Sequence, residues 1–146
     1  MKTLNIYTDG GSRGNPGDAA IGVVICDNQH CVIFRWARYI GDRKTNNEAE
    51  YMAFIAAGQI LAKNYPEIKK VNFYSDSQLV VNQLNGIWRI KKFHLRKLNG
   101  KFIEQIQHLK VVRYQWVSRT HPHIALADAL LNEKLDEHLI DNMLNL

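Results

Sequence analysis

The first part of the chain alternates apolar and polar positions, whereas the later part follows a helical period. From Leu4 to Thr8 apolar side chains alternate with more polar neighbours, which predicts a strand that ends at Asp9, before two glycines. Two further apolar or alternating runs, residues 20–26 and 31–39, are separated by a short polar turn. Together the three runs indicate three consecutive antiparallel strands.

Between residues 45 and 63 the apolar positions recur every three or four residues, which predicts a helix. One face of this helix carries Glu50, Ala53, Phe54, Ala57 and Leu61. The patterns that follow predict a strand, two helices, a strand and a helix, at residues 71–74, 78–84, 96–109, 111–117 and 125–139. This order predicts an α/β fold with a mixed five-stranded sheet, three antiparallel strands first, and helices on both faces.

The composition is that of an ordinary globular protein. Its length of 146 residues fits a single domain over residues 1–146, and 46% hydrophobic with 23% charged residues excludes disordered and collagen-like classes. No apolar run approaches the roughly 20 residues of a membrane-spanning helix, and no signal peptide is visible. Cys26 and Cys31 flank a turn that a disulfide could bridge. Without a secretory signal we instead expect two reduced, core-type thiols in a cytoplasmic protein.

The positive charge is concentrated in one part of the chain. The net charge is +5, but residues 87–119, here named the basic segment, carry nine basic residues and one acidic residue, Glu104. Trp88, Phe93 and His94 lie among these charges. Interleaved bases and aromatic rings suit a surface that follows a phosphate backbone. A solvated helix face is the alternative explanation.

Two glutamates at the start of the predicted helix have different explanations. Thr45 and Glu48 have the spacing of a capping box, in which Glu48 bonds back to the backbone of the cap residue. Glu50 instead heads the apolar face of the helix, where an unpaired charge is costly. We therefore expect a cation beside Glu50.

Three aspartates extend this acidic site. Asp9 and Asp76 each close a predicted strand, and Asp128 follows the apolar line of the last helix, so we expect it to face inward. Taken alone, Asp9 and Asp76 are more readily explained as turn or cap residues. If the first and fourth strands are neighbours, however, all four carboxylates meet at one end of the sheet. They would raise one another's pKa values unless a divalent cation neutralised them, and oxygen-only ligands favour Mg²⁺ or Mn²⁺.

Four ordered motifs in this chain resemble those of a known family. They are Tyr7-Thr8-Asp9-Gly10-Gly11-Ser12-Arg13-Gly14-Asn15-Pro16-Gly17, Thr45-Asn46-Asn47-Glu48-Ala49-Glu50, Ser75-Asp76-Ser77-Gln78 and Ala127-Asp128. The sequence is similar to type 1 ribonuclease H (ribonuclease HI) from the first strand to the last helix, in a compact form without the basic handle. The resemblance implies the ribonuclease H-like fold, in agreement with the sheet predicted above.

The resemblance also implies an activity and a site. The family's members are endoribonucleases that hydrolyse the RNA strand of RNA–DNA hybrids and leave 5′-phosphate and 3′-hydroxyl ends. Two divalent metal ions, Mg²⁺ or alternatively Mn²⁺, are implied to be held by Asp9, Glu50, Asp76 and Asp128. The implied substrate contacts, in part to 2′-hydroxyl groups, are Gly10, Gly11, Asn15, Asn46, Asn47, Glu50 and Gln78. For Gln78 a capping box with Ser75 is the alternative.

Several positions depart from the family pattern. Ile124 stands four residues before Asp128, where the pattern has an asparagine. The loop before the last helix has an irregular length, so the histidine implied to aid proton transfer or product release cannot be aligned uniquely. His121 is the first candidate and His123 the second, and a surface histidine with no catalytic part is the third alternative. Trp88 lies in the compact basic stretch that stands in place of the handle, where it either stacks on the substrate or packs in the core.

Two other functions are compatible with this fold. A non-catalytic module that binds hybrids or double-stranded RNA fits the substituted Ile124, but the set of four carboxylates argues against it. A DNA-cutting core of the transposase or integrase type depends on further domains that 146 residues do not hold. We therefore expect a hybrid-binding enzyme that is a monomer, with no obligate protein partner and no membrane attachment.

Overall fold

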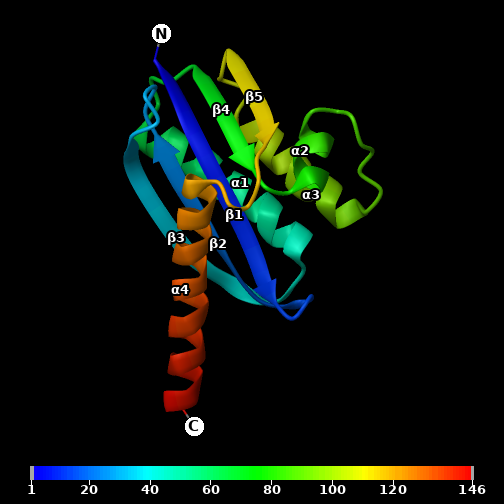
Figure 1. Cartoon of the computed structure of the whole chain (residues 1–146). Helices are drawn as coiled ribbons and strands as arrows, with labels where there is room; N and C mark the ends of the chain where they lie inside the picture. Colours follow the sequence, from blue (N-terminus) through cyan, green and yellow to red (C-terminus); the bar gives the residue numbers. More distant parts are fainter. Residues whose placement is uncertain (1, 146) are drawn as a thin grey trace.

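The chain folds into a twisted sheet with a long helix across one face (Figure 1). The computed structural model describes residues 2–145. Its strands are β1 (Thr3–Arg13), β2 (Gly17–Cys26), β3 (Val32–Lys44), β4 (Lys70–Ser75) and β5 (Val111–Trp116). Its helices are α1 (Asn46–Asn64), α2 (Gln78–Leu84), α3 (Phe93–Gln105) and α4 (Pro122–Leu144).

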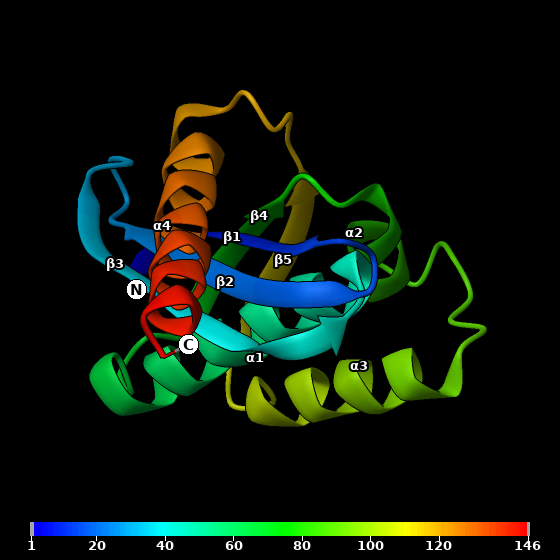
Figure 2. The ribbon, with the colours of Figure 1, turned by 90° about the horizontal axis from the view of Figure 1, so that it is seen from below.

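The sheet is mixed, with the strand order β3-β2-β1-β4-β5. The first three strands form an antiparallel meander, while β4 pairs in parallel with β1 and β5 pairs in parallel with β4. Helices cover both faces: α4 crosses one, and α1 and α3 lie against the other (Figure 2). The predicted fold class is therefore confirmed, including the adjacency of the first and fourth strands.

Each face of the sheet has its own apolar core. On the α1 face Phe54, Phe73 and Phe102 are fully buried, with ring centroids 5.3–5.6 Å apart. On the α4 face the buried Tyr7 and Ile124 pack in a smaller cluster. The sheet thus lies between two packed layers.

The first strand does not stop at the two glycines, contrary to the prediction. β1 continues to Arg13 and pairs with β2 throughout, with Gly10 opposite Ile21. A Cβ atom at Gly10 would lie 2.7 Å from the Glu50 amide nitrogen. The glycine is therefore needed because α1 approaches the strand closely there, and not because the chain turns.

Two helices also differ in their bounds from the prediction. α3 spans Phe93–Gln105 and not residues 96–109, because a tight turn follows it in which Ile106 and Leu109 become buried. α4 begins earlier, at Pro122, because proline suits the first turn of a helix, and it continues to Leu144. Its last turns extend beyond the sheet (Figure 1).

Two expectations from composition can be compared with the structure. Cys26 is buried and Cys31 is exposed, and both are free, so the prediction of a core-type thiol is confirmed for Cys26 and is wrong for Cys31, which lies on the surface beside the β2–β3 turn. Within residues 2–145 no helix combines the length and the apolar character that a membrane crossing requires.

Candidate active site

The parallel pairing of β1 with β4 brings two aspartates together. Tyr7 of β1 lies opposite Tyr74 of β4, so the chain reaches Asp9 and Asp76 at the same end of the sheet two residues later. Glu50 approaches them from the first turns of α1. Carboxylate oxygens of Asp9, Glu50 and Asp76 lie within 4.8 Å of one another, and we name these three residues the carboxylate cluster.

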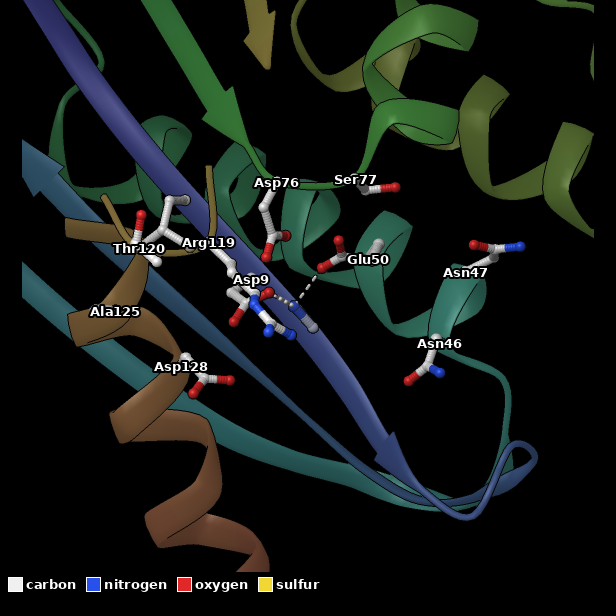
Figure 3. Close-up of a pocket in the computed structure, with 12 residues that line it drawn as sticks. Asp9, Asn46, Asn47, Glu50, Asp76, Ser77, Arg119, Thr120, Ala125 and Asp128 are labelled. Carbon is white, nitrogen blue, oxygen red and sulfur yellow. Dashed lines mark hydrogen bonds between the residues drawn. The ribbon is translucent and has the colours of Figure 1, made fainter. Parts of the chain in front are cut away.

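The start of α1 is built so that Glu50 reaches the strand. Thr45 and Glu48 form the predicted capping box, with each side chain bonded to the other residue's backbone amide. This leaves Glu50 on the inner side of the helix, where it is only 7% exposed. The Gly10 amide donates to Oε1 of Glu50 and to Oδ1 of Asp9, and so links the two acids (Figure 3).

The carboxylate cluster carries unfavourable charge in the protein alone. Burial raises the pKa of Asp9 to about 8, with further contributions from the charges of Asp76 and Asp128. Burial and then the charge of Asp9 raise the pKa of Glu50 as well, and burial raises that of Asp76. Within residues 2–145 no basic side chain forms an ion pair with these acids.

The missing counter-charge fits a divalent cation. Buried carboxylates must either bind protons or be neutralised by a cation, and the cation expected beside Glu50 is not a side chain among the described residues. The donor set contains only oxygen, and the Asp9 and Glu50 side chains are almost wholly removed from water. Hard cations such as Mg²⁺ prefer this chemistry. The residues present therefore fit a divalent metal.

Asp128 reaches the predicted place but is not buried. It lies on α4 and lines the same cavity as the other three acids, but it is exposed and does not pack against the sheet. The buried line of α4 consists of Ile124, Ala127, Leu131 and Leu135, and Asp128 lies beside this line. Its charge still raises the pKa of Asp9, so it acts on the cluster from the solvent side.

A cavity of about 790 Å³ surrounds these acids. It is lined by Asp9, Gly10, Asn46, Asn47, Glu50, Asp76, Ser77, Arg119, Thr120, Ile124, Ala125 and Asp128. Figure 3 shows the acids on one side, and Asn46 and Asn47 beyond Glu50 along α1. Arg119 was missed as a site residue by the sequence analysis, which counted it only within the basic segment. Its position in the loop that carries His121 was the available signal.

Some implied substrate contacts lie outside this lining. Gly11 is paired with Ala20 inside the sheet, and Gln78 is the first residue of α2. The alternative capping box between Ser75 and Gln78 is wrong, because Ser77 is the cap and its hydroxyl accepts from the Val80 amide. The contact role of Gln78 stays a prediction.

Trp88 lies on the surface. It is 45% exposed and lines a second cavity of about 460 Å³ together with Ile87, Arg89, Lys91 and Lys92. Of the two alternatives, packing in the core is therefore excluded by its exposure. Asn47 lines both cavities and lies where they meet.

The two loop histidines pack against tyrosines. The Tyr7 ring stacks on the rings of Tyr74 and His121 and meets that of His123 edge-on. We name these four residues the aromatic cluster. Nδ1 of His121 accepts from the His123 amide at 3.2 Å and so caps α4. Burial lowers the pKa of His123. Neither histidine lines the cavity around the acids, so the proton-transfer role implied for His121 stays a prediction.

Ile124 has a structural task in this chain. It is fully buried and packs with Tyr7, Val24, Cys26 and Ala127 at the base of α4, at the edge of the acidic cavity. An asparagine at this position would place an amide in that apolar contact. The departure from the family pattern is therefore accommodated by the packing under α4.

The sheet order and the buried carboxylates are those of the class of ribonuclease H-like proteins. Known proteins with similar sequences and structures identify the family within this class. A family profile described as "Reverse transcriptase-like" matches residues 7–132. Ribonuclease HI of Haemophilus ducreyi is 34% identical over 134 residues, which cover 84% of this chain and 82% of that protein. LC11-RNase H1, solved in complex with an RNA/DNA hybrid, has 34% identity and a TM-score of 0.86, and covers 93% of this chain and 99% of its own. The chain belongs to the ribonuclease H family.

Some relatives are longer than this chain. A bifunctional protein of Mycobacterium tuberculosis is 35% identical over 136 residues, which cover 93% of this chain but only 36% of the relative. The chain thus spans about a third of that protein, and the similarity concerns its ribonuclease H-like part.

Proposed function

We propose that this protein is a metal-dependent endoribonuclease that hydrolyses the RNA strand of RNA–DNA hybrids. The observation that carries the proposal is the carboxylate cluster, three acids that share one site with no basic partner among the described residues. The hybrid bound to LC11-RNase H1 supports the substrate class. The products would carry 5′-phosphate and 3′-hydroxyl ends.

The four acids have distinct tasks in this proposal. When bound, two Mg²⁺ ions supply an activated water for in-line attack and stabilise the charge that develops on the departing 3′ oxygen. Asp9 would hold metal from within β1, and Asp76 from the position directly after β4. Glu50 would do so from α1, while the Gly10 amide orients its carboxylate. Asp128 is the peripheral ligand, because it reaches the cavity from the exposed side of α4.

The surroundings of the cluster suit a nucleic acid. Arg119 on one side of the cavity offers a guanidinium to a phosphate, and Asn46 and Asn47 offer amides on the other. Trp88 and the lysines beside it form a second, adjoining surface that we assign to the DNA strand. Contacts to 2′-hydroxyl groups and phosphates, not to bases, would make recognition independent of sequence.

The remaining parts of the proposal concern the whole protein. We assign residues 1–146 to a single ribonuclease H domain, because the elements from β1 to α4 share one sheet and its two cores. A monomeric, cytoplasmic enzyme is the simplest form in which it would act.

A cleavage assay with one RNA sequence tests the proposal. The RNA is presented as a hybrid, as a single strand and as an RNA duplex, each with Mg²⁺ or Mn²⁺ and then with EDTA. We expect metal-dependent cleavage of the hybrid, which EDTA abolishes. Hybrid binding without cleavage in either metal would instead identify the non-catalytic module.

A further inference from the structure

Three polar residues join the end of β1 to the start of α1 beside the acidic cavity. The backbone amide and the hydroxyl of Ser12 both donate to Oδ1 of Asn46, at 2.9 and 3.2 Å. The backbone amide of Asn46 donates in turn to Oδ1 of Asn15 at 3.0 Å. These three hydrogen bonds connect Ser12 and Asn15, on and after the end of β1, with Asn46 in the first turn of α1, and we name them the link.

These bonds determine which end of each side-chain amide faces outward. A backbone N–H group can only donate, so the atom that meets it must be the carbonyl oxygen of the asparagine. The NH₂ groups of Asn15 and Asn46 therefore point away from the link. Both residues are exposed, and no acceptor within residues 2–145 bonds to either NH₂ group.

Asn46 lines the same cavity as the carboxylate cluster. Asn46 precedes Glu50 by four residues in α1, so the two side chains share one face of the helix, one turn apart. Both line the same cavity (Figure 3). An oxygen of a strand laid along this face would meet the Asn46 donors one turn before it reaches the acids.

We propose that Ser12 is a positioning residue, which holds the Asn46 amide so that its NH₂ group donates to an oxygen of the RNA strand. The proposal rests on the hybrid-cleaving function above. Ser12 touches no reacting group and acts only through Asn46. The acceptor is an oxygen atom of the RNA strand, and it belongs either to a 2′-hydroxyl group or to a phosphate.

The first test removes the donor and keeps the link. In Asn46→Asp a carboxylate oxygen still accepts both bonds from Ser12, but the residue can no longer donate. We expect the melting temperature to be unchanged or higher, because an acid suits the first turn of a helix. KM for the hybrid should rise about tenfold, which is the change in affinity expected for one lost hydrogen bond. The value of kcat should change less than about twofold.

A neutral variant separates donation from repulsion. In Asn46→Ala the donor is lost without a new charge, so KM should rise by a similar factor. An increase in Asn46→Asp alone would show that the added charge repels the strand, and would overturn the proposal.

The second test measures whether Ser12 acts through Asn46. Ser12→Ala removes one of two anchors and should raise KM by about threefold, and Ser12→Thr, which keeps the hydroxyl, should restore it. In an Asn46→Ala background Ser12→Ala should have no further effect on KM. A purely structural Ser12 would give the same loss in both backgrounds, and that result would overturn the proposal, as would an unchanged KM in Ser12→Ala.

Modified substrates identify the acceptor. Single 2′-deoxynucleotides, and separately single methylphosphonates, are moved along the RNA strand. The proposal requires one position at which the modification weakens cleavage by the wild-type protein but not by Asn46→Ala. If that position is found with 2′-deoxynucleotides, the acceptor is a 2′-hydroxyl group; if it is found with methylphosphonates, the acceptor is a phosphate oxygen. If no position in either series is coupled in this way, the inference is wrong. If the wild-type protein does not cleave the hybrid at all, the proposed function itself fails.

Discussion

Tyr7 and Asp9 are two residues apart on the same face of β1, yet their surroundings are opposite. Tyr7 stacks on Tyr74 and His121 at 4.6 and 4.9 Å, and its hydroxyl lies 3.3 Å from Nδ1 of His30. The hydroxyl, which is the one polar group of the Tyr7 side chain, therefore has a hydrogen-bond partner. Among the described residues, Asp9 accepts a hydrogen bond only from the Gly10 amide, and it faces the two other acids of the carboxylate cluster.

The difference separates what stabilises the fold from what serves chemistry. The aromatic cluster attaches the start of α4 to β1 and β4 through apolar and stacking contacts, so it favours the folded state. The carboxylate cluster opposes folding, because its members lose hydration and repel one another. A site that is unfavourable in the protein alone and fits a cation is expected to be functional.

Substitution of Asp76 should show the largest effect. Asp76→Asn removes one ligand and one negative charge, so we expect hybrid cleavage to fall by at least about a thousandfold, the equivalent of about 4 kcal/mol in the barrier. The free energy of unfolding should be unchanged or higher, since repulsion with Asp9 and Glu50 is relieved. Cleavage rates and urea unfolding at pH 7 measure the two quantities.

The control for this prediction is Glu67→Gln, which neutralises an exposed acid away from the cluster. It should retain wild-type cleavage. An active Asp76→Asn protein would remove Asp76 from the catalytic set.

The stability of the metal-free protein should fall as pH rises. The pKa of Asp9 is raised in the folded state from 3.8 to about 8, so the folded protein holds a proton that the unfolded chain has lost. The contribution of Asp9 is therefore fully present below pH 4 and is lost progressively up to about pH 8. Urea unfolding between pH 5 and pH 9 in EDTA should show this decline.

Two comparisons make the pH prediction specific. Asp9→Asn should flatten the decline, because the variant has no titrating group at this position. Mg²⁺ should stabilise the wild-type protein more at pH 9 than at pH 5, since metal competes with the bound protons. The same slope in Asp9→Asn as in the wild type would contradict the assignment to Asp9.

The origin of each part of the site explains how much of it the sequence could reveal. Asp9 and Asp76 follow from alternation and from parallel neighbours, which are local patterns with one common geometry. Glu50 follows from the capping box, because a cap at Thr45 sets which face every later residue of α1 occupies. These three positions required only secondary structure and sheet order.

Other parts depend on packing that no local pattern specifies. Arg119 reaches the cavity through the path of an irregular loop. Asp128 was expected to face inward, but the buried line of α4 runs through Ile124, Ala127 and Leu131, and Asp128 lies beside this line and is exposed. The two glycines after Tyr7-Thr8-Asp9 were interpreted as a strand end because local sequence does not show the close approach of α1.

Ile124 joins the two regions, and its substitution should cost stability. Ile124→Asn would restore the family pattern at this position, but it puts an amide into the contact with Tyr7 and Val24. We expect a loss of about 3 kcal/mol in the free energy of unfolding, from lost apolar burial and an unpaired polar group. Ile124→Val should lose only about 1 kcal/mol. A stable Ile124→Asn protein with higher activity would show that the asparagine position serves the site here as well.

Substitution of His121 should have the smallest effect, and it compares the two regions directly. The contacts of His121 make it part of the aromatic cluster, whereas the family resemblance implies a catalytic role. His121→Ala removes the side chain that caps α4 and stacks on Tyr7, so the free energy of unfolding should fall by about 1 kcal/mol. If capping is its whole task, kcat of the folded enzyme stays within about twofold of the wild type, and His121→Asn, which can also cap, restores stability. A tenfold or larger loss of kcat in both variants, at a temperature where both are fully folded, would show that the loop moves to bring His121 to the acids. Unfolding and single-turnover cleavage measured on the same preparations distinguish these outcomes.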